Sequence, residues 1–169
     1  EYCELFDRHP KLIGGCIWEW ADHVVMDGDV AKYGGDFSGE LTHDGNFCCD
    51  GMVFADRSLK AGSYEVKAAY QPIRTVYENG ILSVQNRLDF TNLSEYTFTW
   101  WIESDGKTVA QQVLTLEAAP HAAATVAIPY TEAMCRYGVY LNTKLEKNGA
   151  EYAKTQHPLP CVLCKEEKA

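Results

Sequence analysis

Beyond residue 72 the sequence alternates apolar and polar residues, and this period of two constrains the fold more than any other feature. Successive side chains of an extended strand point to opposite faces, so the alternation indicates strands with one buried face. The segment YTFTWWIES is the plainest example, with Tyr96, Phe98, Trp100 and Ile102 on one face. Trp101 lies on the other face and is a candidate for packing against a neighbouring domain.

Turn signals separate these alternating segments. Asn79-Gly80 and Asp105-Gly106 are dipeptides typical of two-residue β-hairpin turns, in which both positions need a positive φ. About seven short strands at this spacing favour an antiparallel β-sandwich over residues 72–169. We expect Phe98 and Trp100 to be buried in its core. Their expected partners are Leu88, Phe90, Val139 and Leu141.

Residues 1–71 have a different pattern. The segment EYCELFDRHP has helical spacing and ends at Pro10, and SYEVKAAYQP predicts a second helix that stops before Pro72. Between them, the apolar run LIGGCIWEWA predicts a short buried strand. Residues 24–57 are rich in Gly and Asp and predict a long loop, which is uncommon unless it has a function.

Composition narrows the class of protein. The chain has 169 residues, of which 46% are hydrophobic, and this is enough for a packed core. A net charge of -9 argues against nucleic acid as a partner. No apolar run approaches the length of a membrane helix, so we expect no membrane partner. Seven cysteines, an odd number at irregular spacing, favour a reduced intracellular setting over a disulfide framework.

Four blocks of the first part carry a resemblance to a known family. In order, they are GGCIWEWADH, YGGDF, NFCCDGMVFADR and YEVKAAYQPI. Together they resemble the end of the catalytic barrel of glycoside hydrolase family 2 β-galactosidases of the large bacterial type. The part beginning NRLDFTNLS resembles the immunoglobulin-like domain that follows this barrel. The resemblance implies a mainly β chain in which residues 1–71 are the C-terminal remnant of a (β/α)8 barrel and residues 72–169 an immunoglobulin-like β-sandwich.

The resemblance also implies a function. It predicts a fragment of an enzyme that hydrolyses terminal β-D-galactosyl residues by a retaining mechanism with two glutamates. Both glutamates would lie upstream of this chain, so the fragment alone is expected to be inactive. The implied partners are a galactoside and the other domains of the same polypeptide, in a homo-oligomeric enzyme of the bacterial cytoplasm. The alternative is a non-catalytic β-sandwich module that binds carbohydrate or joins domains.

The resemblance assigns site residues, none of them catalytic. Trp18 matches a tryptophan of the galactose pocket, although core packing is the commoner role of tryptophan. The carbonyl of Phe47 and the carboxylate of Asp50 match ligands of a monovalent cation, sodium or potassium, and the full-length enzyme is expected to use magnesium as well. His43 and Asp44 lie where the family places polar groups near the pocket.

Other polar motifs have simpler interpretations. The loop aspartates, such as Asp22 and Asp36, are expected to form turns and caps, and Asp56-Arg57 an ion pair or cap. Asn92-Leu-Ser94 is formally a glycosylation sequon, but an Asx-turn is expected there. The lone pair Cys161 and Cys164 lacks the partners of a zinc or thioredoxin-like site. Cys48 and Cys49 are expected to be unreactive thiols.

Overall fold

The computed structural model describes residues 2–43, 45 and 47–164. The chain divides into two compact units, Glu1–Tyr70 and Gln71–Ala169, which we call the N-terminal unit and the sandwich unit. Neither helix in the described part of the chain has the length and apolar composition that crossing a bilayer requires.

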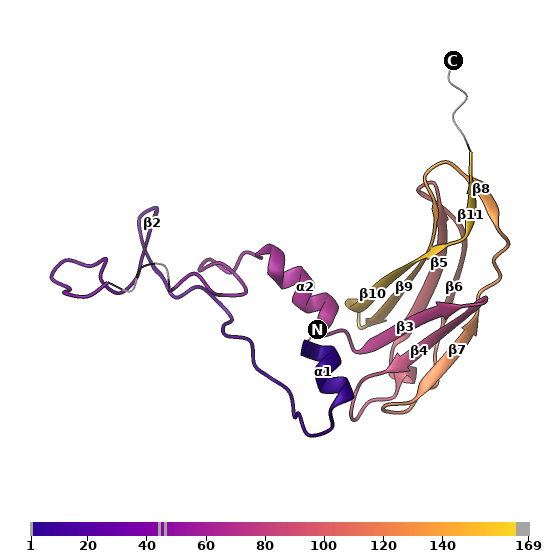
Figure 1. Ribbon diagram of the computed structural model, residues 1–169, viewed down its shortest axis with the longest axis horizontal. Coiled ribbons are helices and arrows are strands. Elements are labelled where there is room, and N and C mark those ends of the chain that lie inside the picture. The colour runs from indigo at the N-terminus through magenta and orange to yellow at the C-terminus, as the bar shows by residue number, and fades with distance from the viewer. Residues whose placement is uncertain (1, 44, 46, 165–169) are drawn as a thin grey trace, which may run out of the picture. The chain divides into compact units, whose positions relative to one another are not determined.

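Two antiparallel sheets form the sandwich unit (Figure 1). The first has the strand order β10-β9-β5-β6 and the second has the order β3-β4-β7. Their strands are β3 Ile73–Glu78, β4 Ile81–Asn86, β5 Thr97–Ser104, β6 Lys107–Leu114, β7 Ala123–Ala127, β9 Val139–Lys147 and β10 Ala150–Leu159. A short 3-10 helix, η1 (Leu93–Glu95), precedes β5, and a parallel pair is formed by β8 (Ala133–Cys135) and β11 (Cys161–Leu163). The predicted antiparallel sandwich is therefore confirmed.

Three hairpins in this unit have a two-residue turn whose second residue is glycine. Asn79-Gly80 joins β3 to β4 and Asp105-Gly106 joins β5 to β6, as the sequence predicts. Asn148-Gly149 joins β9 to β10 in the same way. All six turn residues have a positive φ, between 49° and 81°, which matches the twist of the flanking strands. At η1, the Asn92 carboxamide oxygen accepts a hydrogen bond from the Ser94 amide, which confirms the expected Asx-turn.

The core of the sandwich unit lies between the two sheets. Phe98 is fully buried and Trp100 is only 3% exposed, so the predicted facing of β5 is confirmed. Val139 and Leu141 from β9 are buried in the same cluster, and Leu88 packs against it partly buried.

Phe90 is the exception, because it is 96% exposed and was predicted to be in the core. The alternating segment stops at Asn86, whose buried carboxamide nitrogen donates to the carbonyls of Thr91, Ala118 and Ala119. Its oxygen accepts from the Leu88 amide. This polar junction ends β4 and turns the chain out of the sheet, so the alternation no longer decides which side chains face inward.

The N-terminal unit consists of two helices and a small hairpin. Its elements are α1 Tyr2–Arg8, β1 Val25–Asp27, β2 Val30–Lys32 and α2 Ala61–Ala69. The helices agree with the sequence, and the hairpin lies within the predicted long loop. The predicted strand LIGGCIWEWA is wrong for this chain. Its only ladder contact among the described residues is a parallel bridge between Ala21 and Val53. A buried barrel strand needs a neighbour along each edge, whereas among the described residues this segment is bonded only at its end, to residues 52 and 53.

We expect Trp100→Ala to lower the free energy of unfolding of the sandwich unit by about 3–5 kcal/mol, because a large buried ring leaves a cavity. Phe90→Ala is the matched control and should change it by less than about 0.5 kcal/mol, because the ring is exposed. Urea unfolding followed by far-UV circular dichroism measures both variants. Equal effects of the two substitutions would contradict the assignment of the core.

Candidate functional site

Two segments of the N-terminal unit, residues 19–23 and 48–53, are joined by backbone hydrogen bonds. The amides of Met52 and Val53 donate to the carbonyls of Glu19 and Trp20, at 2.7 and 2.9 Å. In the opposite direction, Asp22 and His23 donate to the carbonyls of Val53 and Cys48, at 3.1 and 3.0 Å. We call this arrangement the paired segments. It places the residue after Trp18 beside the loop that contains Asp50.

Gly51 allows this close approach. A Cβ atom at this position would lie 2.2 Å from the Asp22 nitrogen and 2.4 Å from the Ala21 carbonyl carbon. Both contacts are with backbone atoms, which cannot swing away as the end of a flexible side chain can. Any residue other than glycine would therefore push the paired segments apart.

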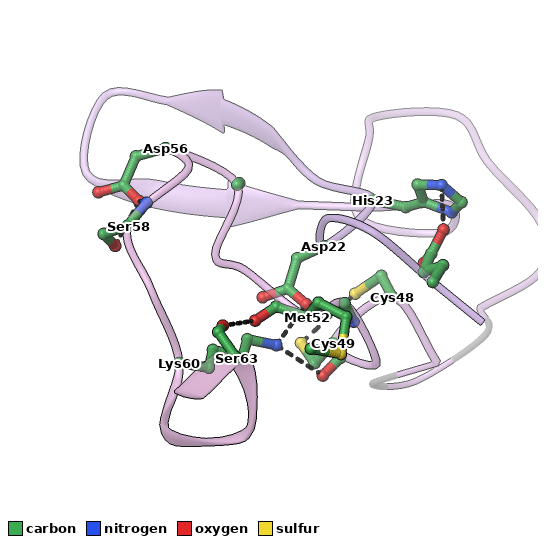
Figure 2. A network of polar contacts seen from close by, with 12 residues as sticks. Asp22, His23, Cys48, Cys49, Met52, Asp56, Ser58, Lys60 and Ser63 are labelled. Carbon is green, nitrogen blue, oxygen red and sulfur yellow. Dashed lines mark hydrogen bonds and ion pairs between the residues drawn. The ribbon is translucent and has the colours of Figure 1, made fainter. Parts of the chain in front are cut away.

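Asp22 anchors the paired segments with its side chain (Figure 2). Its Oδ1 accepts a hydrogen bond from the Gly51 amide at 2.9 Å and forms an ion pair with the Lys60 ammonium at 2.5 Å. Lys60 also donates to the Cys49 carbonyl at 3.1 Å and lies over the Phe54 ring. Both charged side chains are largely buried, so solvent screens their attraction weakly. The Ser63 hydroxyl, from α2, donates to the Met52 carbonyl.

Glu19 is the second acid of this region. Its Oε2 lies 2.5 Å from His23 Nε2, and its buried Oε1 has no hydrogen-bond partner among the described residues. Burial raises the pKa of the Glu19 carboxyl, and the neighbouring Asp50 carboxyl raises it further, while His23 lowers it. Carboxyl groups of Glu19, Asp22 and Asp50 therefore lie close together in this region, beside one histidine and one lysine.

Trp18 is adjacent to Glu19, but the two side chains have different environments. The peptide bond between them is cis. The indole is 74% exposed and is not part of a packed core. It lines an apolar hollow of about 760 Å³ together with side chains from α1, α2 and the segment before it. The lining residues beside Trp18 include Tyr2, Phe6, Ile17, Val66 and Tyr70.

The remaining predicted site residues are distributed as follows. Asp50 lies beside Glu19 and Asp22, and Phe47, with an exposed ring, is three residues before it. His43 is held by other groups, since its Nε2 lies 2.7 Å from Asp36 and its Nδ1 accepts from the Gly45 amide at 2.8 Å. Asp44 lies outside the described residues. The structure thus brings Asp50 to the paired segments that follow Trp18.

The other loop acids stabilise turns. Asp36 accepts from the Tyr33 amide at 2.8 Å, and this bond, followed by that with His43, lowers the pKa of the Asp36 carboxyl. Asp56 accepts from the hydroxyl and amide of Ser58, which lower the pKa of its carboxyl. Arg57 donates to the Ala55 carbonyl, and Asp56 forms an Asx-turn with Ser58; the N-cap of α2 is Lys60, so Asp56 is not a helix cap. The carboxylates of Asp36 and Asp56 therefore stabilise turns in the loops.

Glu19 and Lys60 are the groups of this region that sequence reasoning missed. Glu19 directly follows Trp18, so the alternation of a strand would turn it away from the site, but the segment is not a strand. Lys60 is 38 residues from Asp22, and no local pattern connects the two. Cys48 and Cys49 are free thiols whose sulfurs are 3.7 Å apart, and burial raises the pKa of Cys48. Within the described residues, no group of three or more His, Cys, Asp or Glu side chains is arranged to hold a metal ion.

Comparison with known protein families agrees with this division of the chain. Residues 1–75 match the family described as glycosyl hydrolases family 2, TIM barrel domain. Residues 82–160 match the family described as β-galactosidase, domain 4. The two matches therefore place the chain within glycoside hydrolase family 2, with part of a barrel domain and a β-sandwich.

Curated relatives give the same result. The chain is 39% identical to a β-galactosidase of Priestia megaterium over 138 residues, which is 77% of this chain and 13% of the relative. It is 37% identical to a β-galactosidase of Staphylococcus xylosus over 74% of this chain and 13% of the relative. A β-galactosidase 2 of Enterobacter cloacae is 30% identical over 96% of this chain and 17% of the relative.

The chain belongs to the glycoside hydrolase family 2 β-galactosidases. It spans about 13% of the length of the first two of these relatives. The resemblance predicted from four short blocks is confirmed.

Gly51→Ala should open the paired segments, because the added Cβ overlaps the Asp22 and Ala21 backbone. We expect the free energy of local opening to fall by about 3 kcal/mol. The Val53 amide, bonded to the Trp20 carbonyl, reports this loss by hydrogen exchange. Gly62→Ala in α2 is the matched control, since its Cβ would meet no atom within 4 Å and alanine favours a helix. Unchanged Val53 protection in Gly51→Ala would contradict the close approach.

Proposed function

We propose that this chain forms part of a β-galactosidase that hydrolyses terminal β-D-galactosyl residues, and that Trp18 contacts the sugar. The observation that supports this role is the contrast between Trp18 and its neighbours. The paired segments fix the backbone at Glu19 and Trp20, while the Trp18 indole stays exposed beside an apolar hollow. An exposed, flat aromatic ring next to a fixed stretch of backbone can stack on the apolar face of a pyranose.

The proposed chemistry is retaining hydrolysis with two carboxyl groups. One carboxylate attacks the anomeric carbon, while the other protonates the leaving oxygen and then activates water. The acids of the N-terminal unit are suited to other roles, because Asp22 pairs with Lys60, and Asp36 and Asp56 hold turns. We therefore propose that two glutamates outside this chain carry the reaction, and that the isolated chain is inactive.

We further propose that Phe47 and Asp50 help to hold a sodium or potassium ion beside the sugar. A backbone carbonyl and a carboxylate are the oxygen ligands that such hard cations take. The carboxyl of Glu19 lies near Asp50, and its buried Oε1 has no hydrogen-bond partner among the described residues, although these side chains do not by themselves form a metal site. Two donors do not complete a coordination shell, so further ligands must come from elsewhere. The proposal of magnesium concerns the full-length enzyme and assigns no residue here.

The sandwich unit is proposed to join domains of the same polypeptide. It is an immunoglobulin-like domain with its own core, and the half-buried Trp101 on the outer face of β5 offers an apolar contact for a neighbour. Nucleic acid and membrane are not proposed as partners. A homo-oligomer in the bacterial cytoplasm is the proposed setting, and the seven free cysteines are compatible with it.

A chimera tests the proposed role of Trp18. This chain replaces the matching segment of the Priestia megaterium β-galactosidase, and hydrolysis of an aryl β-galactoside is measured. We expect Trp18→Leu to lower kcat/KM about tenfold or more, since the loss of about 1.4 kcal/mol of contact corresponds to a factor of ten. Trp20→Leu is the matched control, because Trp20 is also exposed and lies two residues away. Equal kcat/KM values of the two variants would show that Trp18 does not contact the sugar. Turnover by the isolated chain would contradict the proposal that the catalytic glutamates lie outside this chain.

The same chimera tests the cation ligands. We expect Asp50→Ala to weaken activation by sodium or potassium about tenfold, because a charged oxygen ligand is lost. Asp50→Asn keeps an oxygen donor and should retain most of the activation. The measurement is kcat/KM against sodium or potassium chloride, with a bulky quaternary ammonium salt keeping ionic strength constant. An unaltered cation dependence in Asp50→Ala would exclude this site.

A further inference from the structure

The sandwich unit contains two thiols in close contact that are distant in the sequence. The Sγ atoms of Cys135 and Cys161 are 2.7 Å apart, although the residues are separated by 26 positions. Cys135 is 2% exposed and Cys161 is half-buried. The sequence pattern pairs Cys161 with Cys164 instead, so only the fold identifies Cys135 as its neighbour.

Contacts that do not involve the thiols hold this arrangement. β8 and β11 form a parallel ladder in which Cys161 is opposite Ala133 and Leu163 is opposite Cys135. The Cys164 amide donates to the Cys135 carbonyl at 2.8 Å, which extends the ladder by one residue. The Tyr130 hydroxyl donates to the Pro160 carbonyl at 2.5 Å, directly before Cys161. Both strands are thus fixed on either side of the sulfur contact.

We propose that Cys135 and Cys161 form a reversible dithiol–disulfide pair that links β8 to β11. A disulfide bond is about 2.0 Å long, so the sulfurs need to approach by less than about 1 Å. The oxidant is a small-molecule disulfide such as glutathione disulfide.

The reaction proceeds by two exchanges. The more accessible Cys161 thiolate attacks one sulfur of glutathione disulfide, whose S–S bond breaks and releases one glutathione thiolate. The Cys135 thiolate then attacks the Cys161 sulfur of the mixed disulfide and releases the second glutathione thiolate. Two protein thiols lose two electrons and two protons, and one glutathione disulfide becomes two glutathione thiols.

The environment of Cys135 makes the second exchange slow near neutral pH. In the dithiol, the hydrogen bond to Cys161 raises the pKa of Cys135 to about 11, and burial, which also acts in the mixed disulfide, raises it in the same direction. The thiolate is the attacking species, and its fraction grows about tenfold for each pH unit as long as the pH is below the pKa of the buried thiol. Closure of the disulfide should accelerate accordingly between pH 7 and pH 9.

The experiment uses the 169-residue chain in a glutathione redox buffer with a metal chelator. Closure of the pair removes two hydrogen atoms, about 2 Da, from the intact mass. Tryptic cleavage should then give residues 108–136 linked to residues 155–165. The link closes a loop in the unfolded chain, so the oxidised protein should melt about 5–10 °C above the reduced one, and reduction should reverse the shift.

Variants identify the bonded cysteines. Cys164→Ser should retain the linked peptides and the thermal shift, and Cys161→Ser, at a half-buried position that tolerates a hydroxyl, should lose both. Cys48 and Cys49, whose sulfurs are 3.7 Å apart, are an internal control and should remain reduced in the same buffer. A Cys161–Cys164 bond, a link that survives in Cys161→Ser, or no loss of mass in the parent chain would each overturn the proposal.

Discussion

Burial of the inner face of β5 is the constraint on which the sandwich unit depends. This strand is hydrogen-bonded to β6 along one edge and to β9 along the other, so its backbone groups are satisfied within one sheet. Its inward side chains, Phe98, Trp100 and Ile102, are almost fully buried. An apolar sheet face must be covered by a second layer, and the β3-β4-β7 sheet supplies it. The polar junction at Asn86 fixes where that second layer ends and the chain leaves it.

The N-terminal unit depends on polar contacts instead. Its helices expose large apolar side chains, and the few buried residues lie where the paired segments meet. Asp22 joins the Gly51 amide and the Lys60 ammonium, and these bonds hold together residues that are far apart in the chain. This distribution of contacts fits membership of a barrel domain, in which neighbouring strands cover apolar surface. Backbone bonds to the carbonyls of Glu19 and Trp20 hold the chain directly after Trp18, whose indole stays exposed.

The two units therefore contribute in different ways to the proposed enzyme. The N-terminal unit offers the aromatic ring of Trp18 and oxygen donors near Asp50. Several of its other acidic side chains form ion pairs or turns within the unit. The sandwich unit has a complete core of its own and offers surfaces for joining domains. The close pair of Cys135 and Cys161 lies in this second unit, at the short parallel ladder outside both main sheets. Its chemistry is independent of sugar hydrolysis.

The sequence by itself determined the sandwich, the hairpins at Asn79-Gly80 and Asp105-Gly106, and the family. These features depend on local alternation, on turns that need a positive φ, and on short blocks of residues. It did not determine the exposure of Phe90, because strand β4 ends through bonds between Asn86 and residues more than 30 positions away. It also missed the Lys60 partner of Asp22 and the Cys135 partner of Cys161. Only the tertiary structure decides such pairs, since each joins residues from distant segments whose local patterns carry no information about each other.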